Sequence, residues 1–328
     1  GNLTRPHLRP PVMTGTVGLV LQALGAVFVG KVALSVATYF YQAFLKLGLN
    51  LKKYRRDGDW AVVTGATDGI GRAYAAALAA KGFNLLIVSR TQAKLDAVEK
   101  ELLAANPGIS VRTHRLDFTD LSPSSVDPLL TFLRELQVAV LVNNVAVNVE
   151  MPTYFEEVDL TLMRNIVSCN TLGTALLTHA VLPQMKARKR GVVVNLSSIG
   201  GTVPSAMLQP YGATKAFVEN FSEALAEETA KHGIVVQCNV PYFVKTAMAN
   251  RSKASTLIPE PEAFVAASLA KLGTAKTLSP YWSHALVLFA LGCLPHALVV
   301  PYVHNLHVDI RKRSIRKKER QAQQGKKD

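Results

Sequence analysis

The sequence predicts an α/β protein built on a doubly wound parallel sheet. Six short, apolar, β-branched runs alternate with segments of helical periodicity. This alternation is typical of parallel strands joined by right-handed helical crossovers, which place helices on both faces of the sheet and a ligand crevice at the carboxyl ends of its strands. The predicted strands are Trp60–Thr64, Asn84–Ser89, Val111–Asp117, Val138–Asn143, Val192–Ser197 and Val235–Val240.

Two of the connecting segments carry clear helix signals. Thr91 stands at the N-cap position of an amphipathic run that ends at Asn106-Pro107-Gly108, and a longer helix is predicted over 214–232. With 328 residues, of which 49% are hydrophobic, the chain is long enough for one sizeable domain with additions.

The formal net charge of +14 is concentrated at the two ends of the chain. Residues 1–60 hold eight Lys or Arg against two acids, and residues 304–328 hold nine against three, so each end carries +6 and the rest carries +2. A nucleic-acid-binding protein would be expected to carry its charge on the folded module, whereas here the charge flanks apolar segments. We therefore predict no nucleic-acid partner and expect the basic ends to face anionic membrane lipid.

Cysteines and histidines give no sign of a disulfide framework or a metal site. The three cysteines are an odd number, widely separated and without a Cys-x-x-Cys pair, which fits a reducing compartment. His304 and His307 are close enough in sequence to share a helix face as ligands, but an interfacial helix face is the favoured interpretation, so no metal is predicted. The cysteines are Cys169, Cys238 and Cys293.

Residues 12–45 are almost all apolar or small, with Lys31 as the only charge. At ~1.5 Å per residue, a helix of this length exceeds the ~30 Å hydrocarbon core of a bilayer, so we predict a transmembrane segment. A cleaved signal peptide and a buried core helix are the less favoured alternatives. Basic residues are more numerous after the segment than before it, which places the following domain in the cytosol by the positive-inside rule. They are Lys46, Lys52, Lys53, Arg55 and Arg56 after it, against Arg5 and Arg9 before it.

A second apolar stretch runs from Tyr281 to Val303, without Lys, Arg, Asp or Glu. Pro295 and Pro301 argue against one straight spanning helix. An interfacial helix or a shallow membrane hairpin is the favoured interpretation; a helix that caps a substrate tunnel is the alternative, and both can hold together. The tail 311–328 is basic and polar and is predicted to be disordered.

These patterns divide the chain into four parts. A membrane anchor with a basic linker occupies 1–58, a nucleotide-binding domain 59–278, an apolar membrane-associated or substrate-capping segment 279–310, and the basic tail 311–328. The last three residues, Lys326-Lys327-Asp328, are similar to the lysine-based retrieval signals of endoplasmic-reticulum proteins, and a solvated tail explains them equally well.

A glycine-rich run predicts a phosphate-binding turn. Gly65, Gly69 and Gly71 follow the first predicted strand and open a helix, a context in which the backbone closely approaches a pyrophosphate and helix-end amides face it. Their Gly-x-x-x-Gly-x-Gly spacing departs from the usual Gly-x-Gly-x-x-Gly fingerprint, and as a bare pattern it is also compatible with a simple turn. The other members of the predicted site in this run are Thr67, Asp68, Ile70 and Arg72.

The end of the second strand predicts which nicotinamide cofactor is bound. An NAD-binding domain carries an acid at this point, whereas here the strand ends in Ser89 and Arg90. A guanidinium suits a 2′-phosphate, and Arg72 adds positive charge. NADP(H) is therefore preferred over NAD, with an exposed arginine unrelated to a cofactor as the alternative.

Tyr211 and Lys215 are four residues apart, which puts them on one face of a helix, and Ser198 lies thirteen residues upstream of the tyrosine. A fixed positive charge beside a phenol favours the phenolate, so Lys215 is expected to lower the pKa of Tyr211 from its ordinary value near ~10. Ser198 supplies a second hydroxyl to the same substrate oxygen. A lone Tyr-x-x-x-Lys is more often an ordinary helix face, but this one accompanies the serine and the glycine run.

The order of these motifs resembles the short-chain dehydrogenase/reductase superfamily, whose domain is a Rossmann sheet. The likeness covers 60–250 and rests on Thr64–Gly71, Asn143-Asn144, Ser198 and Tyr211-x-x-x-Lys215. More narrowly, four segments are similar to the membrane-bound group of 17β-hydroxysteroid dehydrogenases and very-long-chain 3-oxoacyl-CoA reductases. They are Trp60–Tyr74, Val181–Met185, Val240–Thr246 and Tyr281–Leu286.

This resemblance implies roles for the site residues. Tyr211 would protonate the carbonyl oxygen as hydride arrives from the nicotinamide, Ser198 would hydrogen-bond that oxygen, and Lys215 would lower the tyrosine pKa and hold the nicotinamide ribose. The family's further asparagine, thirteen residues before the proline of the Val-Leu-Pro segment, corresponds to Asn170 and would position a water in the proton path. Further cofactor contacts would come from Asp117 and Asn144 on the adenine side, and from Val244 and Thr246, the latter at the nicotinamide carboxamide.

Two positions depart from the superfamily pattern. Ala146 stands where a glycine is usual shortly after Asn-Asn, which puts the local geometry of the cofactor loop in question. Tyr242 stands where much of the superfamily has a glycine after proline, as is normal in the membrane-bound subgroup.

The resemblance and the membrane segments favour an endoplasmic-reticulum, NADPH-dependent reductase of 3-oxoacyl-CoA in very-long-chain fatty acid elongation, with its catalytic domain facing the cytosol. A 17-ketosteroid reductase is the close alternative, and a catalytically silent NADP-binding membrane scaffold is a third. Lys245, Arg251 and Lys253 could bind the phosphates of an acyl-CoA, with a solvated loop as the alternative. Expected partners are the acyl-CoA or steroid substrate, membrane lipid, other elongation enzymes and a second copy of the chain in a homodimer.

Overall fold

The computed structural model describes residues 16–249 and 253–324, and the chain forms two compact units that divide between Lys46 and Leu47. The first unit is helical, with α1 (Thr16–Phe40) continuing into the π-helical turn η1 (Tyr41–Leu45). The helical run Val17–Leu45 has 29 residues, and its most apolar stretch of 18 residues has a mean hydropathy of 2.0. At ~1.5 Å per residue the run reaches about 43 Å, long enough to cross a bilayer. Residues 12–15 of the predicted segment lie outside the described residues.

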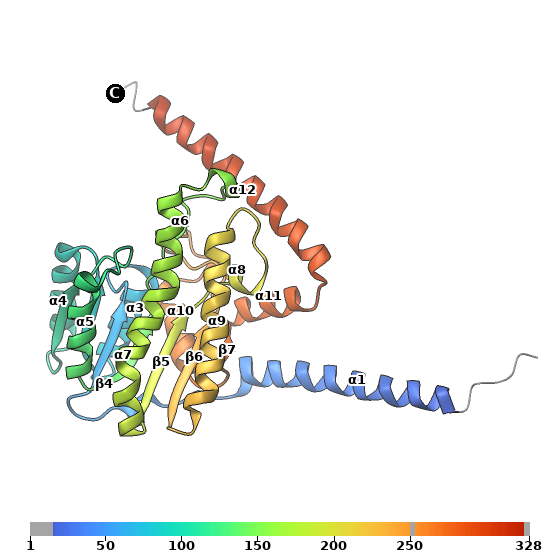
Figure 1. Cartoon of the computed structure of the whole chain (residues 1–328), viewed down its shortest axis with the longest axis horizontal. Helices are drawn as coiled ribbons and strands as arrows, with labels where there is room; N and C mark the ends of the chain where they lie inside the picture. The colour runs from blue at the N-terminus through green and yellow to red at the C-terminus, as the bar shows by residue number, and fades with distance from the viewer. Residues whose placement is uncertain (1–15, 250–252, 325–328) are drawn as a thin grey trace, which may run out of the picture. The chain divides into compact units, whose positions relative to one another are not determined.

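The second unit contains a seven-stranded sheet in which all neighbouring strands pair in parallel (Figure 1). The order β3-β2-β1-β4-β5-β6-β7 means that the chain moves outward first on one side of β1 and then on the other, which confirms the predicted doubly wound sheet. The strands are β1 (Trp60–Thr64), β2 (Asn84–Ser89), β3 (Val111–Arg115), β4 (Val138–Asn143), β5 (Gly191–Leu196), β6 (Ile234–Asn239) and β7 (Thr277–Leu278). The sequence did not predict β7, because two residues are too few to show a period.

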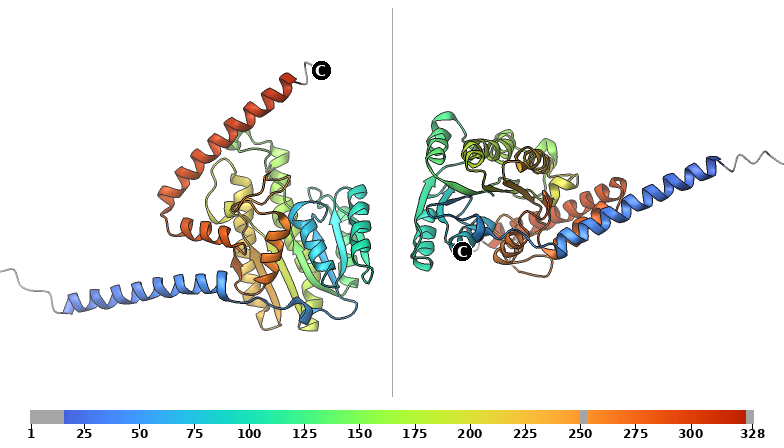
Figure 2. Two further views of the ribbon diagram at one scale, coloured as in Figure 1. Left: turned by 180° about the vertical axis from the view of Figure 1, so that it is seen from behind. Right: turned by 90° about the horizontal axis from the view of Figure 1, so that it is seen from below.

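Helices cover both faces of the sheet, as Figure 2 shows from two further sides. All five residues of β1 are buried, and neighbouring side chains enter different cores, with Val63 on one face and Val62 on the other. This double burial explains why the strands appear in the sequence as continuous apolar runs. The first face carries α3 (Gly69–Ala79), α4 (Gln92–Ala105) and α10 (Pro261–Ala270), and the second carries α5 (Pro123–Glu135), α7 (Gly173–Arg188) and α9 (Gln209–Ala230).

One long apolar helical run belongs to the core of the second unit. Residues 160–188 are also long and apolar enough to cross a membrane, but half of their apolar window is buried inside the unit. The run is divided by a π turn into α6, η3 and α7. The shorter elements are α2 (Leu51–Tyr54), η2 (Phe155–Glu157), α6 (Leu160–Val167), η3 (Ser168–Leu172) and α8 (Ile199–Thr202).

The C-terminal part consists of α11 (Trp282–Gly292) and α12 (His296–Gln324), with Pro295 in the break between them. The predicted disordered tail is wrong from 311 to 324, because α12 continues through these residues. Lys, Arg, Glu and Gln are good helix formers, and two ion pairs hold the helix to the loop after β4. These pairs are Arg311–Glu157 (2.8 Å) and Lys318–Glu150 (2.6 Å). Residues 325–328, which include the lysine pair of the predicted retrieval signal, lie outside the described residues.

Candidate active site

The predicted site residues gather at one edge of the sheet. Gly65 directly follows β1, Asn144 directly follows β4, and Ser198 lies two residues beyond the end of β5. Because the carboxyl ends of parallel strands meet at the same edge, residues far apart in the sequence become neighbours there.

The glycine run forms a turn that no larger residue could complete. Gly65 and Gly69 have φ of +64° and +51°, in the left-handed region that favours glycine. A Cβ on Gly71 would lie 2.2 Å from the carbonyl oxygen of Gly65. Asp68 caps α3 by accepting a hydrogen bond from the amide of Gly69 (2.7 Å). The turn lets a ligand approach the backbone closely at the N-terminus of an 11-residue helix. This geometry suits a phosphate, and a turn with only a connecting role would not need it.

Asn144 holds this turn from the side. Its backbone amide donates to the hydroxyl of Thr64 (2.9 Å), and its side-chain amide donates to the carbonyl of Thr64 (3.0 Å) and to that of Gly65 (3.4 Å). The resemblance implied a contact on the adenine side, and the structure adds a role in positioning the glycine turn.

The two arginines predicted to favour a 2′-phosphate have different surroundings. Arg72 forms an ion pair with Glu101, and both side chains are about half exposed. Arg90 is exposed at the end of β2 and has no ion pair among the described residues. Beside it, the hydroxyls of Ser89 and Thr67 are hydrogen-bonded (2.9 Å). Arg90 is therefore the better placed of the two cations to meet a phosphate.

Tyr211, Ser198 and Lys215 form one cluster. The helix α9 begins at Gln209, five residues earlier than predicted, with Pro210 in its first turn, so Tyr211 and Lys215 stand one turn apart on it. The hydroxyl of Tyr211 is hydrogen-bonded to Ser198, and the ammonium of Lys215 lies 5.7 Å from the centre of the tyrosine ring. The same ammonium donates to the carbonyl of Leu196 (2.7 Å).

Burial decides the ionisation of this cluster. It raises the pKa of Tyr211, and the hydrogen bond from Ser198 lowers it only in part. The lowered pKa expected for Tyr211 is thus not found in the protein alone, because burial is the largest cause of the shift. The ammonium of Lys215 lies over the ring and donates to the carbonyl of Leu196. Lys215 is 3% exposed, and burial lowers its own pKa to about 8.

Asn170 connects the cluster to the loop after β4. It is 1% exposed and lies in η3, where the helix widens to a π turn of the kind often found at functional sites. Its side-chain oxygen accepts from the amide of Val147 (2.7 Å), and its side-chain nitrogen donates to the carbonyl of Val147 (3.0 Å) and to the hydroxyl of Thr214 (3.0 Å). Thr214 in turn donates to the carbonyl of Tyr211 (2.7 Å).

Glu219 is a site neighbour that the sequence reasoning missed. Ser197 donates both to the carbonyl of Lys215 (2.9 Å) and to the carboxylate of Glu219 (2.7 Å). Burial raises the pKa of Glu219, and its charge raises that of Lys215. A signal was present in the sequence, since Tyr211, Lys215 and Glu219 recur at intervals of four residues and share one face of α9.

A buried polar layer lies directly below the site and was also missed. Asn143 at the end of β4 donates to Asn195 of β5 (2.8 Å) and to Thr178 of α7 (3.0 Å). Asn195 donates to Ser222 of α9 (2.9 Å). These bonds join two strands to two helices, in β4 one residue before Asn144 and in β5 three residues before Ser198.

The first turn of α11 holds the segment that follows β6. His284 is 1% exposed; its Nδ1 accepts from the amide of Tyr242 (3.3 Å), and its Nε2 is 3.1 Å from the carbonyl of Leu257. Ser283 donates to the carbonyl of Thr256 (2.6 Å). Both ends of this segment are therefore pinned.

The pinned segment carries two predicted cofactor contacts and the basic residues proposed for phosphate binding. Val244 is buried, and Thr246 lies against the glycine turn, where a Cβ on Gly69 would be 2.8 Å from its methyl carbon. Lys245 is paired with Glu260 (2.7 Å), and Lys253 is exposed. Arg251 lies outside the described residues.

Asp117 lies at the adenine side of the predicted site, beyond the end of β3. It is exposed, and its carboxylate accepts from the amide (3.0 Å) and the hydroxyl (2.9 Å) of Thr119. This turn fixes the direction in which the chain leaves the sheet.

The family model of the short chain dehydrogenase matches residues 59–256. The chain belongs to this family. A very-long-chain 3-oxoacyl-CoA reductase of Laccaria bicolor is 41% identical to it over 313 residues, with 92% of each chain covered. One of Podospora anserina is 39% identical over 309 residues, with 92% of this short-chain dehydrogenase and 91% of the relative covered. The predicted superfamily and its oxidoreductase class are confirmed.

Solved structures of the family share the sheet. A short-chain dehydrogenase from Sphingobium yanoikuyae in complex with NADPH aligns with a TM-score of 0.63 and 28% identity, over 71% of this chain and 92% of that one. A metagenomic short-chain oxidoreductase in complex with NADP aligns with a TM-score of 0.57 and 29% identity, over 68% and 96%. A 7β-hydroxysteroid dehydrogenase aligns with a TM-score of 0.70 and 22% identity, over 78% of this chain and 99% of that one. At this identity the likeness shows the shared fold alone.

Gly71→Ala is expected to destabilise the second unit. The new methyl group would lie 2.2 Å from a backbone oxygen, and overpacking of this kind costs ~1–3 kcal/mol, or a Tm lower by about 3–10 °C. Gly108→Ala is the matched control, since nothing lies within 4 Å of its Cβ position. Thermal denaturation of both variants measures the difference, and equal Tm values would show that the turn is not closely packed.

His284→Gln is expected to flatten the pH dependence of stability. Burial lowers the pKa of His284 below its ordinary value of 6.5, so the unfolded chain binds the proton more readily. The stability that His284 contributes is full above pH 6.5 and is lost as the pH falls through 6.5 towards the lower folded pKa. The Tm of the unmodified chain should therefore fall more than that of the variant between about pH 7.5 and 5.5. His114 and His307 also have lowered pKa values, but they are present in both proteins and cancel in the comparison. If Tm falls equally with pH in both proteins, His284 accepts the proton without loss of structure.

Proposed function

We propose that this short-chain dehydrogenase reduces very-long-chain 3-oxoacyl-CoA to 3-hydroxyacyl-CoA with NADPH, in fatty acid elongation. The observation that carries the proposal is the alignment with very-long-chain 3-oxoacyl-CoA reductases over 92% of the chain. This alignment extends well beyond residues 59–256, which are the part that the general family model matches. The similarity therefore includes parts outside the nucleotide-binding sheet, where substrate specificity resides in a fold that many enzymes share.

The proposed proton donor is Tyr211. Its raised pKa keeps the phenol protonated at neutral pH, as a group that donates to a carbonyl oxygen must be. Ser198, already hydrogen-bonded to the phenol, would donate to the same oxygen as negative charge develops on it. Lys215 is proposed to supply a fixed positive charge behind the tyrosine ring. Asn170 is proposed to hold α9 and the loop after β4 in fixed positions around the substrate.

The residues at the carboxyl edge fit NADP(H). The glycine turn gives a cradle that a Cβ would fill, and Arg90 gives a guanidinium free of ion pairs with the described residues. The bound cofactor supplies the hydride. We propose that the turn residues from Gly65 to Arg72 hold the pyrophosphate, and that Ser89 and Arg90 select the 2′-phosphate. The remaining proposed contacts are Asp117, Asn144, Tyr211, Lys215, Val244 and Thr246.

The proposed location is the endoplasmic-reticulum membrane, with the catalytic unit in the cytosol. The apolar helix Val17–Leu45 and the lysines and arginines that follow it support this orientation. The helix α11, the link after it and the first turns of α12 present apolar side chains to solvent, as an interfacial contact would. They are Trp282, Leu286, Leu294, Leu298 and Tyr302, each at least 40% exposed. Such a contact would bring the site close to a substrate whose acyl chain resides in lipid.

A homodimer is proposed through α9. Phe217 is 41% exposed and stacks on Phe221, which packs partly against the core, with ring centres 5.8 Å apart. Exposed aromatic side chains of this kind are enriched in protein interfaces.

The substrate is tested by NADPH oxidation with the full chain in detergent, offered a long 3-oxoacyl-CoA or a 17-ketosteroid. We expect faster turnover of the thioester, and a loss of about 10²–10⁴-fold in Tyr211→Phe, the range that a positioned proton donor contributes. Tyr302→Phe changes the proposed lipid contact and not the cluster around Tyr211, so it should retain full activity in detergent, where no bilayer is present.

Two other outcomes would contradict the proposal in different ways. Turnover of the steroid alone would identify a 17β-hydroxysteroid dehydrogenase. Turnover of neither compound, with NADPH still bound, would identify an NADP-binding membrane scaffold.

A further inference from the structure

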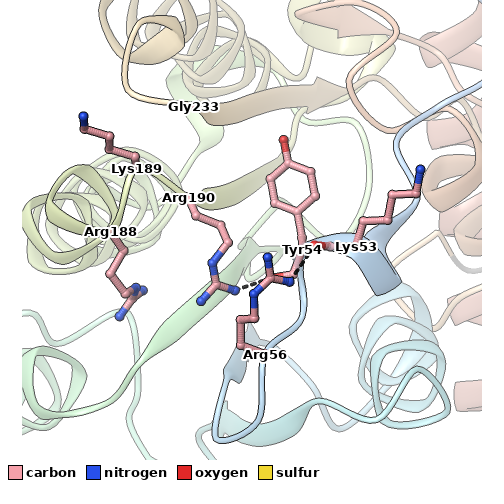
Figure 3. A pocket seen from close by; sticks show the side chains of 7 residues that line it. All are labelled: Lys53, Tyr54, Arg56, Arg188, Lys189, Arg190 and Gly233. Atoms are coloured by element: carbon pink, nitrogen blue, oxygen red, sulfur yellow. Dashed lines mark hydrogen bonds between the residues drawn. The ribbon is translucent and has the colours of Figure 1, made fainter.

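A basic cavity lies at the amino-terminal edge of the sheet, the edge opposite the candidate active site (Figure 3). Its position follows from the chain, since Arg190 directly precedes β5 and Gly233 directly precedes β6. The cavity has a volume of about 620 Å³ and is open to solvent. It is lined by Lys53, Tyr54, Arg56, Arg188, Lys189, Arg190 and Gly233.

The lining contains five cations and no acid. Asp59, which is buried nearby, is fully engaged: its carboxylate forms an ion pair with Arg190 and accepts from the backbone amide of Arg56 (2.7 Å). One of the five positive charges is therefore matched by an internal carboxylate.

Among the described residues, the other four cations of the lining have no ion pair, although Asp59 acts on Arg188 from a distance. The guanidinium of Arg56 donates to the carbonyls of Lys53 and Arg55 (both 3.0 Å), and that of Arg188 donates to Gln184 (2.9 Å) and to the carbonyl of Val138 (2.6 Å). These bonds fix the orientation of the guanidinium groups without cancelling their charge.

Two details show that the cavity is short of negative charge. The Nε of Arg188 is buried without a hydrogen-bond partner, and burial lowers the pKa of this residue, with Asp59 opposing and Arg190 adding to the effect. Lys53 and Lys189 have no ion pair in the described part of the chain, and Figure 3 shows them on opposite sides of the cavity with Tyr54 between them.

We propose that this cavity binds the phosphate of an anionic membrane phospholipid. A phosphate has enough oxygens to interact with several cations at once, and its charge would relieve the repulsion among them. The lipid is favoured over a free phosphate by the connectivity of the chain. Lys53 lies eight residues after Leu45, the end of the apolar helix, so an extended chain could carry it no more than about 29 Å from that point.

The composition of the lining agrees with this assignment. Clusters of lysine and arginine immediately beyond a membrane helix attract anionic headgroups, and a tyrosine among them is typical of the membrane interface. Lys53 and Arg56 come from the segment next to the helix, whereas Arg188 and Lys189 come from the end of α7, so folding of the second unit assembles the site. The proposal is independent of the reaction at the other edge of the sheet.

The test is the affinity of the full chain, in a neutral detergent, for dibutanoyl phosphatidic acid, whose short acyl chains keep it in solution. Lys53→Gln combined with Lys189→Gln should raise the Kd by about thirtyfold, the effect expected from the loss of two cations near an anionic headgroup. Lys94→Gln combined with Lys100→Gln removes the same charge from exposed positions on α4 and should leave the Kd unchanged. Equal Tm values would show that both double variants are folded.

Two further ligands separate the sources of the phosphate. Dibutanoyl phosphatidylcholine, which has no net charge, should bind much more weakly than phosphatidic acid. If inorganic phosphate binds as tightly as phosphatidic acid, the cavity recognises a soluble phosphate and the lipid assignment is overturned. An unchanged Kd in the cavity variant would show that the phosphate binds elsewhere.

Discussion

The burial of one ammonium group governs the arrangement of the whole carboxyl edge. Lys215 is held inside the protein by a hydrogen bond to Leu196, and the helix that carries it must approach the chain after β5 very closely. Glycines permit that approach, since a Cβ on Gly201 would lie 2.6 Å from the backbone of Lys215 and one on Gly212 would lie 2.7 Å from the carbonyl of Gly200. Tyr211 then meets Ser198 because α8 and α9 are in contact at these glycines.

The surroundings of the site are rigid for a related reason. Polar groups buried at the ends of β4 and β5 are costly unless they are paired, and here each is paired with a hydroxyl or an amide on a neighbouring element. Asn143 and Asn195 therefore fix the helices as well as the strands, and His284 fixes the segment beyond β6 in the same way. Ser198 and the glycine turn lie beyond strand ends and Tyr211 and Lys215 lie on α9, and hydrogen bonds attach these segments to the core close to the chemistry.

The sequence predicted the sheet well, and it named site residues that the fold brings to one edge, because both depend on local signals. Apolar runs marked six strands, and the glycine turn and Ser198 lie just beyond the carboxyl ends of two of them, where such motifs are expected. The sequence failed where tertiary contacts decide. The pKa of Tyr211 depends on burial and not on the neighbouring lysine alone. The polar tail is rich in good helix formers, and Arg311 and Lys318 also form ion pairs with acids on a distant loop. The basic cavity could not be predicted from local sequence patterns, because Lys53 and Arg56 are joined there by residues at the end of α7, more than a hundred positions later in the chain.

The pH dependence of NADPH-dependent reduction by the full chain tests the role of Lys215 most directly. Burial lowers the pKa of Lys215 to about 8, so its positive charge is present below that value and is lost above it, while the raised pKa of Tyr211 keeps the phenol protonated. The rate should be level near neutral pH and fall with a midpoint at about pH 8. In Lys215→Met the rate should be much lower and should lack that midpoint. A rate that stays level to about pH 9.5 in the unmodified chain would contradict this role of Lys215.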